Sequence, residues 1–550
     1  MKMKWNKRIF LFVKYLFSVL LICVSFTRTD NIMYVVTGLS EAAAVILLTE
    51  LLLHINAILG YLMNSLFLLI LNLQFIVLLF ATEFISGVML DNIMAADMLR
   101  GKAVLYITAL LAVFVISFLP VSSLKIEKIW NFGWLSILLF AQLCIALFIG
   151  NTFFAYYRFA DTLAERVETL SVGNMTEGGG ADETLFILGD TAQTFEKPAI
   201  LPENPNIIMI FSEGCSQCII DDERNIMPNM RSFMERSISF SNYYNHTAAT
   251  YRGLIGTLFS GYQLMNLDPN YLVSIEDILR NRGYTSTFIN VEPKNATFAR
   301  YLQDMRFDEV ISPETESGKE GLIYDDQAYS YLAEQAERLK GAGKPFFLGI
   351  YTIGTHISFK SPGEVFGDGS SDLLNRFYYM DLQFGKFLDW FDQSDLADNT
   401  LLVFTTDHCT YSNEEYTDVF DTENRLPFVD TIPFAFYHRD IVPLQINADG
   451  RNSLDCIPTI CDYLDITDGN CFLGTTMFAD MGEIDNDYDT ITCIGMDMVS
   501  TMGGVLALVQ DQQKEILEDK LLQYFTMAKD RSHADKRIEK EYDKSGGNQQ

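Results

Sequence analysis

The first 156 residues contain five apolar stretches, each close to the roughly 20 residues with which an α-helix crosses a bilayer. These stretches cover residues 9–27, 33–54, 60–82, 103–122 and 131–156. The second contains Glu41 and Glu50, which either face the interior of a helix bundle or show that its boundary lies elsewhere. Five apolar segments in succession argue against a cleaved signal peptide. The sequence therefore predicts a transmembrane domain of about five helices over residues 1–156.

Basic residues near the ends of these stretches predict how the domain lies in the membrane. The N-terminus carries four of them before residue 9, and Lys125 and Lys128 fall on the same side if all five stretches cross. Arg100 and Lys102 fall on the opposite side, but the balance places the N-terminus in the cytoplasm. An odd number of crossings then places everything after residue 160 outside the cytoplasm. We expect a multi-pass protein of the cell membrane with an extracytoplasmic C-terminal part.

Charge divides the chain at the same point. Residues 1–160 carry 11 Lys and Arg against 7 Asp and Glu, a net charge of +4, and the other 390 residues carry 29 against 64, a net charge of −35. Nucleic acid is excluded as a partner, because phosphate binding on that scale needs basic residues. The nine cysteines include a C-x-x-C at Cys215 and Cys218, for which local packing or a disulfide is favoured over a redox or soft-metal site.

The acidic part alternates short apolar runs with segments of helical periodicity. The runs predict strands over residues 206–212, 285–291, 345–352, 400–406 and 432–437. The periodic segments predict helices over residues 226–236, 274–282, 325–340, 373–393 and 454–464. This alternation predicts an α/β domain over residues 201–500, with a mostly parallel sheet covered by helices. A juxtamembrane helix and Gly-rich linker are expected over 157–200, and a charged helix with a polar tail over 501–550.

Two of the predicted strands end abruptly in carboxylates. Glu213 follows the first strand, and Asp407 with His408 follows the fourth. Side chains just past the carboxyl ends of parallel strands line the ligand crevice of an open α/β sheet, so these residues are expected to meet there. With the hydroxyl of Thr250 they offer oxygen and nitrogen ligands for one divalent metal ion, Mn first, with Mg and Zn as alternatives. A hydroxyl bound to such an ion has a lowered pKa and can act as a nucleophile, which indicates an enzyme.

The order of the motifs is similar to that of a known family. NIIMIFSEG is followed by NHTAATYRGLIGTLFSG, KPFFLGIYTIGTHISF, NTLLVFTTDHC and SLDCIPTICDYLDI, across about residues 205–475. This order resembles the alkaline phosphatase and sulfatase superfamily, and within it the membrane-anchored lipoteichoic acid synthase and phosphoglycerol transferase branch. The resemblance implies that Glu213, Asp407 and His408 are metal ligands and that a nucleophile opens a helix. Thr250, at the start of TYRGLIGTLFSG, is the first choice for the nucleophile and Thr247 the second.

Two further positions follow from the resemblance. His356 in TIGTHISF matches the histidine that the branch places near the phosphate, where an imidazole can stabilise phosphate oxygens or protonate a leaving alkoxide. The branch also places an arginine before a segment like MRFDEV, to contact the head-group. The sequence departs from the branch there, and Lys294 or Arg300 in VEPKNATFARYLQDMRF is the candidate replacement. The run TYRGL at the nucleophile also excludes the aldehyde chemistry of sulfatases.

The resemblance implies a transferase that moves a phosphoglycerol-type group from a membrane phospholipid to a cell-envelope polymer or glycolipid, through a phospho-threonine intermediate. A phosphoethanolamine transferase acting on a surface glycolipid would share every metal ligand. A phosphodiesterase of the same fold would need only water as the acceptor. A metal-binding surface protein without activity is the alternative from a different class.

Overall fold

The computed structural model describes residues 7–29, 31–81, 84–92, 103–175, 194–263, 272–313, 322–357, 359–420, 426, 428–479, 488–494, 497–509 and part of 513–524. The chain divides into two compact units, Met1–Ser171 and Val172–Gln550. Residues 176–193 of the expected linker and the tail beyond residue 524 lie outside the described residues.

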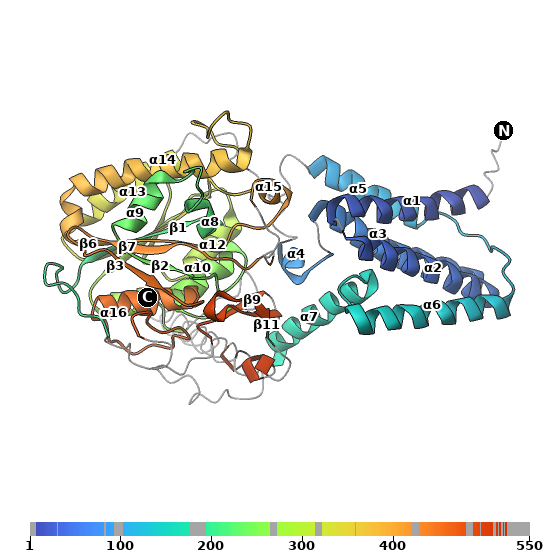
Figure 1. Cartoon of the computed structure of the whole chain (residues 1–550). Coiled ribbons are helices and arrows are strands. Elements are labelled where there is room, and N and C mark those ends of the chain that lie inside the picture. Colours follow the sequence, from blue (N-terminus) through green and yellow to red (C-terminus); the bar gives the residue numbers. More distant parts are fainter. Residues whose placement is uncertain are drawn as a thin grey trace, which may run out of the picture. The chain divides into compact units, whose positions relative to one another are not determined.

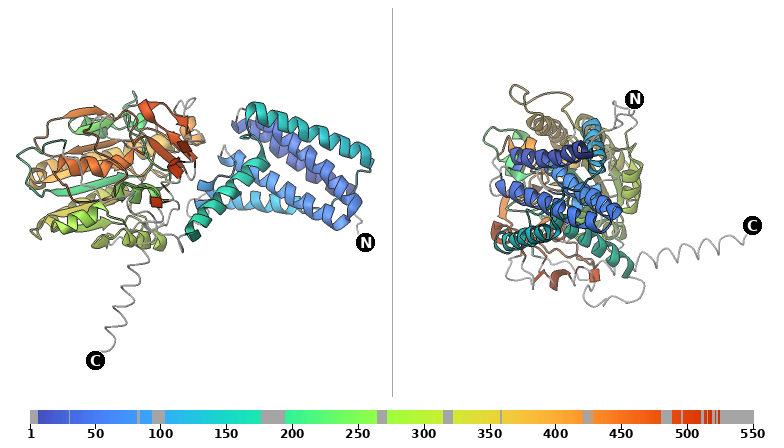
Figure 2. Two further views of the ribbon diagram at one scale, coloured as in Figure 1. Left: turned by 90° about the horizontal axis from the view of Figure 1, so that it is seen from below. Right: turned by 90° about the vertical axis from the view of Figure 1, so that its right-hand side faces the viewer.

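The first unit is a bundle of helices whose long members run alongside one another (Figures 1 and 2). Its helices are α1 (Lys7–Thr29), α2 (Ile32–Ile55), α3 (Ala57–Ala81), α4 (Gly87–Asn92), α5 (Ala103–Ser117), α6 (Lys128–Ile149) and α7 (Ala155–Met175). Among the described helices, α1, α2, α3 and α6 are long and apolar enough to cross a membrane. The expectation of five such spans is wrong by one. Because α5 has 15 residues, it extends about 22 Å, against a hydrocarbon core of about 30 Å.

Both acidic residues of α2 are buried within the bundle. Glu50 accepts a hydrogen bond from the N–H of Leu124 (2.8 Å), shortly before α6 begins. Glu41 accepts hydrogen bonds from the N–H groups of Ala155 (3.1 Å) and Tyr156 (3.0 Å), where α7 begins. The two carboxylates therefore fasten the chain on both sides of α6 to α2, and α6 runs antiparallel to α2. Of the two interpretations left open by the sequence, the inward-facing one is correct.

The second unit contains an eight-stranded sheet with the strand order β4-β3-β5-β1-β6-β7-β2-β8. The strands are β1 (Asn206–Ser212), β2 (Ile238–Ser241), β3 (Thr285–Ile289), β4 (Glu309–Ile311), β5 (Phe346–Thr352), β6 (Thr400–Thr406), β7 (Phe434–Tyr437) and β8 (Leu444–Asn447). The strands from β4 to β6 pair in parallel, whereas β7 is antiparallel to both β6 and β2. The expected mostly parallel sheet is confirmed.

Helices cover both faces of this sheet, with α13 and α14 along one face and α10 and α16 along the other (Figure 1). The helices of this layer are α9 (Pro228–Glu235), α10 (Thr250–Phe259), α11 (Ile275–Asn281), α12 (Ala296–Asp304), α13 (Asp325–Lys340), α14 (Asp372–Gln393) and α16 (Cys456–Tyr463). Every residue of β1, β5 and β6 is buried, which explains why these strands read as unbroken apolar runs. The shorter strands β2, β4 and β8 have three or four residues each, too few to show a period in the sequence.

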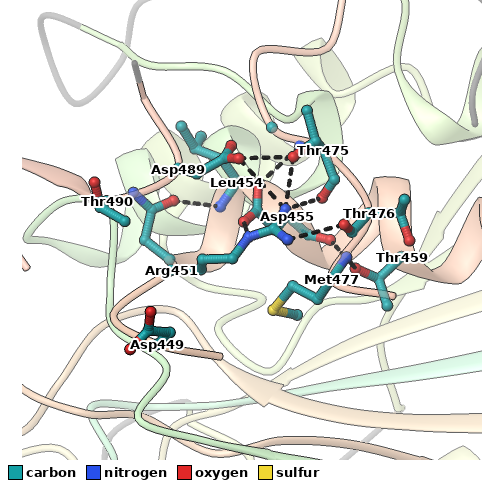
Figure 3. Close-up of polar contacts among 12 residues, drawn as sticks. Asp449, Arg451, Leu454, Asp455, Thr459, Thr475, Thr476, Met477, Asp489 and Thr490 are labelled. Atoms are coloured by element: carbon teal, nitrogen blue, oxygen red, sulfur yellow. Dashed lines mark hydrogen bonds and ion pairs between the residues drawn. The ribbon is translucent and has the colours of Figure 1, made fainter. Parts of the chain in front are cut away.

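A buried ion cluster fastens the segment after α16 to the rest of the second unit (Figure 3). The Nε of Arg451 lies 2.6 Å from Oδ2 of Asp455, and its Nη2 lies 3.4 Å from Oδ2 of Asp489. The Thr475 hydroxyl donates to Asp489 (2.7 Å), and Nη1 of Arg451 donates to the carbonyl oxygen of Thr476 (2.9 Å). Buried charges stabilise a fold only when they are paired and hydrogen-bonded, as these are. The cluster is therefore structural.

Candidate active site

The register of two neighbouring strands brings the predicted carboxylates together. Ser212, the last residue of β1, pairs with Thr406, the last residue of the parallel strand β6. The next residues, Glu213 and Asp407, therefore leave the same edge of the sheet as neighbours. Ligand atoms of Glu213, Asp407 and His408 all lie within 4.8 Å of one another, and all three side chains are buried.

The chain bends just after β6, which lets Asp407 and His408 face the same point. Oδ1 of Asp407 accepts hydrogen bonds from the N–H groups of Gly214 (2.9 Å) and His408 (2.8 Å). Its other oxygen, Oδ2, is buried and has no hydrogen-bond partner among the described residues. Nδ1 of His408 lies 2.7 Å from the carbonyl oxygen of Cys409, so Nδ1 donates there and Nε2 faces the carboxylates. The bend thus leaves one carboxylate oxygen and one ring nitrogen available as ligands.

These residues fit a divalent cation. Nε2 of His408 lies 3.5 Å from Oε1 of Glu213 and 3.5 Å from Oδ2 of Asp407. Around a tetrahedral metal ion with bonds of about 2.1 Å, two ligand atoms lie about 3.4 Å apart, close to these distances. Burial raises the pKa of Asp407, and the charge of Glu213 adds to this. Burial opposes charge on His408, but the two carboxylates outweigh it and raise its pKa. The buried carboxylates therefore require positive charge between them, which a metal ion would supply.

The helix α10 places a hydroxyl against this cluster. Its first residue, Thr250, donates a hydrogen bond from Oγ1 to Oε2 of Glu213 (3.3 Å). The preceding residue, Ala249, has φ 78° and ψ 139°, a conformation that non-glycine residues rarely adopt and that recurs at functional sites. A Cβ at Gly253 would lie 2.0 Å from the carbonyl oxygen of Asp407. Glycine at that position lets α10 touch the backbone at the end of β6.

The structure distinguishes Thr250 from the other threonines of this segment. Thr247 is buried, and its hydroxyl lies 3.5 Å from the carbonyl oxygen of the adjacent Ala248. Thr257 is fully buried, and its hydroxyl has no hydrogen-bond partner among the described residues. Of the three, Thr250 is the one with a described hydrogen bond to the carboxylate cluster.

Two tyrosines that sequence reasoning missed complete the surroundings of the cluster. The hydroxyl of Tyr351, the second-last residue of β5, donates to Oε2 of Glu213. The ring of Tyr411 stacks on the His408 ring, with centroids 4.5 Å apart and planes 7° apart. The Tyr411 hydroxyl also accepts a hydrogen bond from the N–H of Ala249 (2.9 Å). Tyr351 is buried in a strand and reads as core in a sequence, and Tyr411 is a half-buried residue of the loop after β6, so no pattern indicated either residue.

The predicted His356 lies in the loop after β5. The hydroxyl of Thr355, the residue before it, donates to the carbonyl oxygen of Glu213 (2.5 Å) and holds this loop against the end of β1. Burial lowers the pKa of His356 to about 4, and the positive charges of His408 and Arg376 add to the effect. The imidazole of His356 is neutral at pH 7 and suits hydrogen bonding to a phosphate oxygen.

The predicted head-group residues lie on or beside α12, which precedes β5 in the chain. Lys294 and Arg300 are both exposed. The helix α12 packs against α10, because the ring of Tyr251 lies 5.6 Å from that of Phe298 and 4.9 Å from that of Tyr301. Within the described residues no contact joins either basic side chain to the carboxylate cluster. Their role stays a prediction.

The C-x-x-C motif packs beside the cluster. Cys215 is fully buried, and burial raises the pKa of its thiol well above the usual range. Sγ of Cys218 lies 3.0 Å from the hydroxyl of Tyr416. A buried thiol with a raised pKa is a poor nucleophile and a poor metal ligand, which favours the packing interpretation.

Residues 205–466 match the sequence model of the Sulfatase family. The lipoteichoic acid synthase-like protein YvgJ of Bacillus subtilis (strain 168) is 24% identical over 321 residues, which are 51% of this chain and 50% of that protein. Phosphoglycerol transferase I of Xanthomonas campestris pv. campestris (strain B100) is 22% identical over 301 residues, 48% of this chain and 41% of that protein. The chain thus spans about half or less of the length of these relatives.

Two solved structures show the same fold. The integral membrane protein lipooligosaccharide phosphoethanolamine transferase A of Neisseria meningitidis has a TM-score of 0.53 at 12% identity, covering 83% of this chain and 95% of that one. An alkaline phosphatase superfamily protein of Vibrio parahaemolyticus has a TM-score of 0.52 at 17% identity, covering 68% and 96%. Residues 205–466 therefore match the Sulfatase family and have the fold of these two structures, and the resemblance of the chain to the lipoteichoic acid synthase and phosphoglycerol transferase branch is confirmed.

Proposed function

We propose that this protein is a membrane-anchored, metal-dependent phosphotransferase that moves a phosphoglycerol-type group from a phospholipid to a cell-envelope acceptor. The names of the two curated relatives support this reaction class. The observation that carries the proposal is the hydroxyl of Thr250, which opens α10 and contacts Glu213 beside Asp407 and His408. A divalent cation held by these four residues would lower the pKa of the Thr250 hydroxyl and offset charge on the phosphate.

The reaction has two displacements at phosphorus. Oγ1 of Thr250 attacks the phosphodiester and loses its proton, and the bond between phosphorus and the diacylglycerol oxygen breaks. The diacylglycerol alkoxide takes up a proton and leaves, while phosphoglycerol stays bound to Thr250. A hydroxyl of the acceptor then attacks phosphorus, gives up its proton and regenerates the Thr250 hydroxyl. Two in-line displacements give net retention of configuration at phosphorus.

Neighbouring groups would hold the phosphate during both steps. The first N–H groups of a helix lack intrahelical acceptors, and together with the helix dipole they bind anions. Because Thr250 is the first residue of α10, its phosphate would lie at this helix N-terminus. The neutral imidazole of His356 can donate a further hydrogen bond to a phosphate oxygen. Such donors stabilise the charge that develops on phosphate oxygens in the transition state.

The contacts within the helix bundle support an extracytoplasmic catalytic unit. The hydroxyl of Thr37, near the start of α2, donates to the carbonyl oxygen of Phe153 (2.6 Å), just before α7. The chain therefore leaves the bundle at the end where α1 finishes, opposite the basic N-terminus. Asn131 near the start of α6 donates to the carbonyl oxygen of Leu47 (3.0 Å), so Lys128 lies at the same end as the N-terminus. With basic residues in the cytoplasm, the catalytic unit emerges on the outer side.

The donor can be identified with purified full-length protein in mixed micelles. Fluorescent phosphatidylglycerol and phosphatidylethanolamine are supplied separately with Mn, Mg or Zn, and diacylglycerol release is followed. Release from phosphatidylglycerol is the expected result, and release from phosphatidylethanolamine instead would assign the phosphoethanolamine reaction. Turnover of neither lipid with any of the metals would refute the transferase proposal.

The nucleophile is tested by Thr250→Ala, with Thr257→Ala on the same helix as the matched control. Thr250→Ala should abolish diacylglycerol release while bound metal stays nearly unchanged, because Glu213, Asp407 and His408 remain. Thr257→Ala should retain turnover, since its hydroxyl is remote from the cluster. A fully active Thr250→Ala enzyme would exclude Thr250 as the nucleophile.

A further inference from the structure

The helix bundle contains a cavity of about 460 Å³ between α2 and α6, within the size range of ligand pockets. Ala44 and Leu48 of α2 line one wall, and Leu139, Leu143 and Ala146 of α6 line the other. The α6 residues recur every three or four positions, so they form one face of that helix. The lining of α6 extends from position 135 to 146, about 16 Å along the helix. The cavity is therefore a long apolar groove.

The helix α6 is less buried than the other long helices of the bundle. In the apolar 18-residue stretch of α6, only 6% of the residues are buried, whereas the corresponding share in the other three long helices is 33–50%. Leu139 and Leu143 are exposed although they line the cavity, so the groove opens toward the surroundings of the bundle. In a membrane those surroundings are lipid chains. The groove is thus accessible to a lipid from the side.

Polar groups gather at one end of the groove. Glu41, Asn151, Tyr156 and Tyr157 line it there, where the chain passes from α6 to α7, and Gln142 lines it about two turns before the end of α6. This is the end at which the chain leaves the bundle toward the catalytic unit. Of the described lining residues, Glu41 alone is acidic and none is basic, and both oxygens of Glu41 accept backbone hydrogen bonds. The groove therefore combines a long apolar wall with a polar end, and no basic residue is among its described lining.

We propose that this groove binds an uncharged diacylglycerol-type lipid, with its acyl chains along α2 and α6 and its glycerol hydroxyl at the polar end. No described residue of the lining is basic, so a phosphate in the groove would be a buried charge without a cation to pair with. A lipid hydroxyl can instead donate to a carboxylate or amide oxygen, and the ester carbonyls can accept from Gln142, Asn151 or Tyr157. The choice of lipid rests on the proposed function, in which diacylglycerol is the leaving group.

Binding can be measured without catalysis in full-length Thr250→Ala protein. The protein is reconstituted in phosphatidylcholine nanodiscs with a diacylglycerol that carries a photoreactive group in one acyl chain. We expect crosslinks on the groove faces of α2 and α6, competed by unlabelled diacylglycerol and only weakly by phosphatidylglycerol. Ala146→Trp should reduce labelling about tenfold by filling the groove, and Leu147→Trp, on the adjacent exposed face, should not. Ala44→Phe fills the groove from α2 and serves if Ala146→Trp misfolds.

Each outcome bears on the proposal. Equal labelling of the groove-filling and control variants would overturn it. Equally effective competition by phosphatidylglycerol and by diacylglycerol would also overturn it, because the groove would then bind membrane lipids without selectivity. Because Thr250→Ala does not turn over, the crosslinking result does not depend on activity. Absence of transferase activity in the unmodified protein would refute the proposed function while leaving selective diacylglycerol binding intact.

Discussion

Substitution of Gly253 by alanine is the sharpest test of how the site is assembled. The added Cβ would lie 2.0 Å from the carbonyl oxygen of Asp407 and 2.7 Å from its carbonyl carbon. Ordinary contact begins at 3.4 Å, so α10 and the end of β6 would have to separate by about 1.4 Å. Both of these Asp407 atoms belong to the backbone, so no change of side-chain rotamer can relieve the overlap. Thr250 is less than one turn away on the same helix and would move with it.

A misplacement of about 1 Å at a reacting group costs about 100-fold in rate, which corresponds to about 2.7 kcal/mol of transition-state stabilisation. We therefore expect Gly253→Ala to lower kcat for diacylglycerol release about 100-fold. Overpacking would also destabilise the fold by roughly 1–3 kcal/mol, which thermal unfolding of the same sample reports separately. The reduction in kcat should persist at temperatures where the variant is fully folded.

The matched control is Gly341→Ala at the end of α13. A Cβ there would lie 3.3 Å from the carbonyl oxygen of Arg338, a contact that needs a shift of only about 0.1 Å. The variant should keep wild-type kcat. The reasoning would be refuted by a folded Gly253→Ala enzyme with kcat close to that of the wild type, because α10 would then not need its backbone contact with β6.

Tyr411→Phe keeps the ring stack on His408 but removes the acceptor for the Ala249 N–H. Steady-state kinetics should therefore show a kcat about tenfold lower than that of the wild type, with bound metal unchanged. Equal rates would show that this hydrogen bond does not position Thr250. Burial raises the pKa of Glu276 from its ordinary 4.5 to about 8, so the folded protein keeps a proton that the unfolded chain releases between these values. The free energy of unfolding should therefore fall as pH rises through this window, by on the order of 5 kcal/mol, and Glu276→Gln should remove this dependence in denaturant titrations at pH 5 and 8.5. Identical pH profiles for both proteins would contradict that assignment. Arg451→Met leaves two carboxylates buried without their cation and should destabilise the second unit by about 3–5 kcal/mol, whereas Arg338→Met, at an exposed ion pair with Glu309, should cost less than about 1 kcal/mol. Similar unfolding midpoints for the two arginine variants would refute the role given to the buried cluster.

Local sequence patterns predicted most of the elements, because burial on both faces leaves a direct trace in composition. The predicted strands at 206–212 and 400–406 coincide with β1 and β6, and the predicted helix at 325–340 coincides with α13. The fourth apolar stretch was overestimated, since apolar residues continue past Ser117 while the helix does not. Hydropathy reports which residues avoid water, and it does not report where a helix ends.

The meeting of Glu213 with Asp407 could be predicted because both follow strands that share one parallel edge. Nothing in the sequence indicated Tyr351 or Tyr411. The Tyr351 hydroxyl donates to Glu213, and the Tyr411 hydroxyl accepts from the N–H of Ala249, each from a distant segment of the chain. Their roles depend on which strand lies beside which and on how the loops fold back. Such contacts have no period and no fixed spacing along the chain.

The sequence by itself determined the division into an apolar bundle and an acidic α/β unit, and it contains the chemical groups on which the proposed phosphoryl transfer depends. Only the tertiary structure decided which of the candidate threonines contacts the carboxylates, why glycine stands at position 253, and that α2 and α6 enclose a groove. The physical reason is that burial and local propensity act within a segment of chain. Distances between side chains, in contrast, are set by strand register and by helix packing across the whole fold.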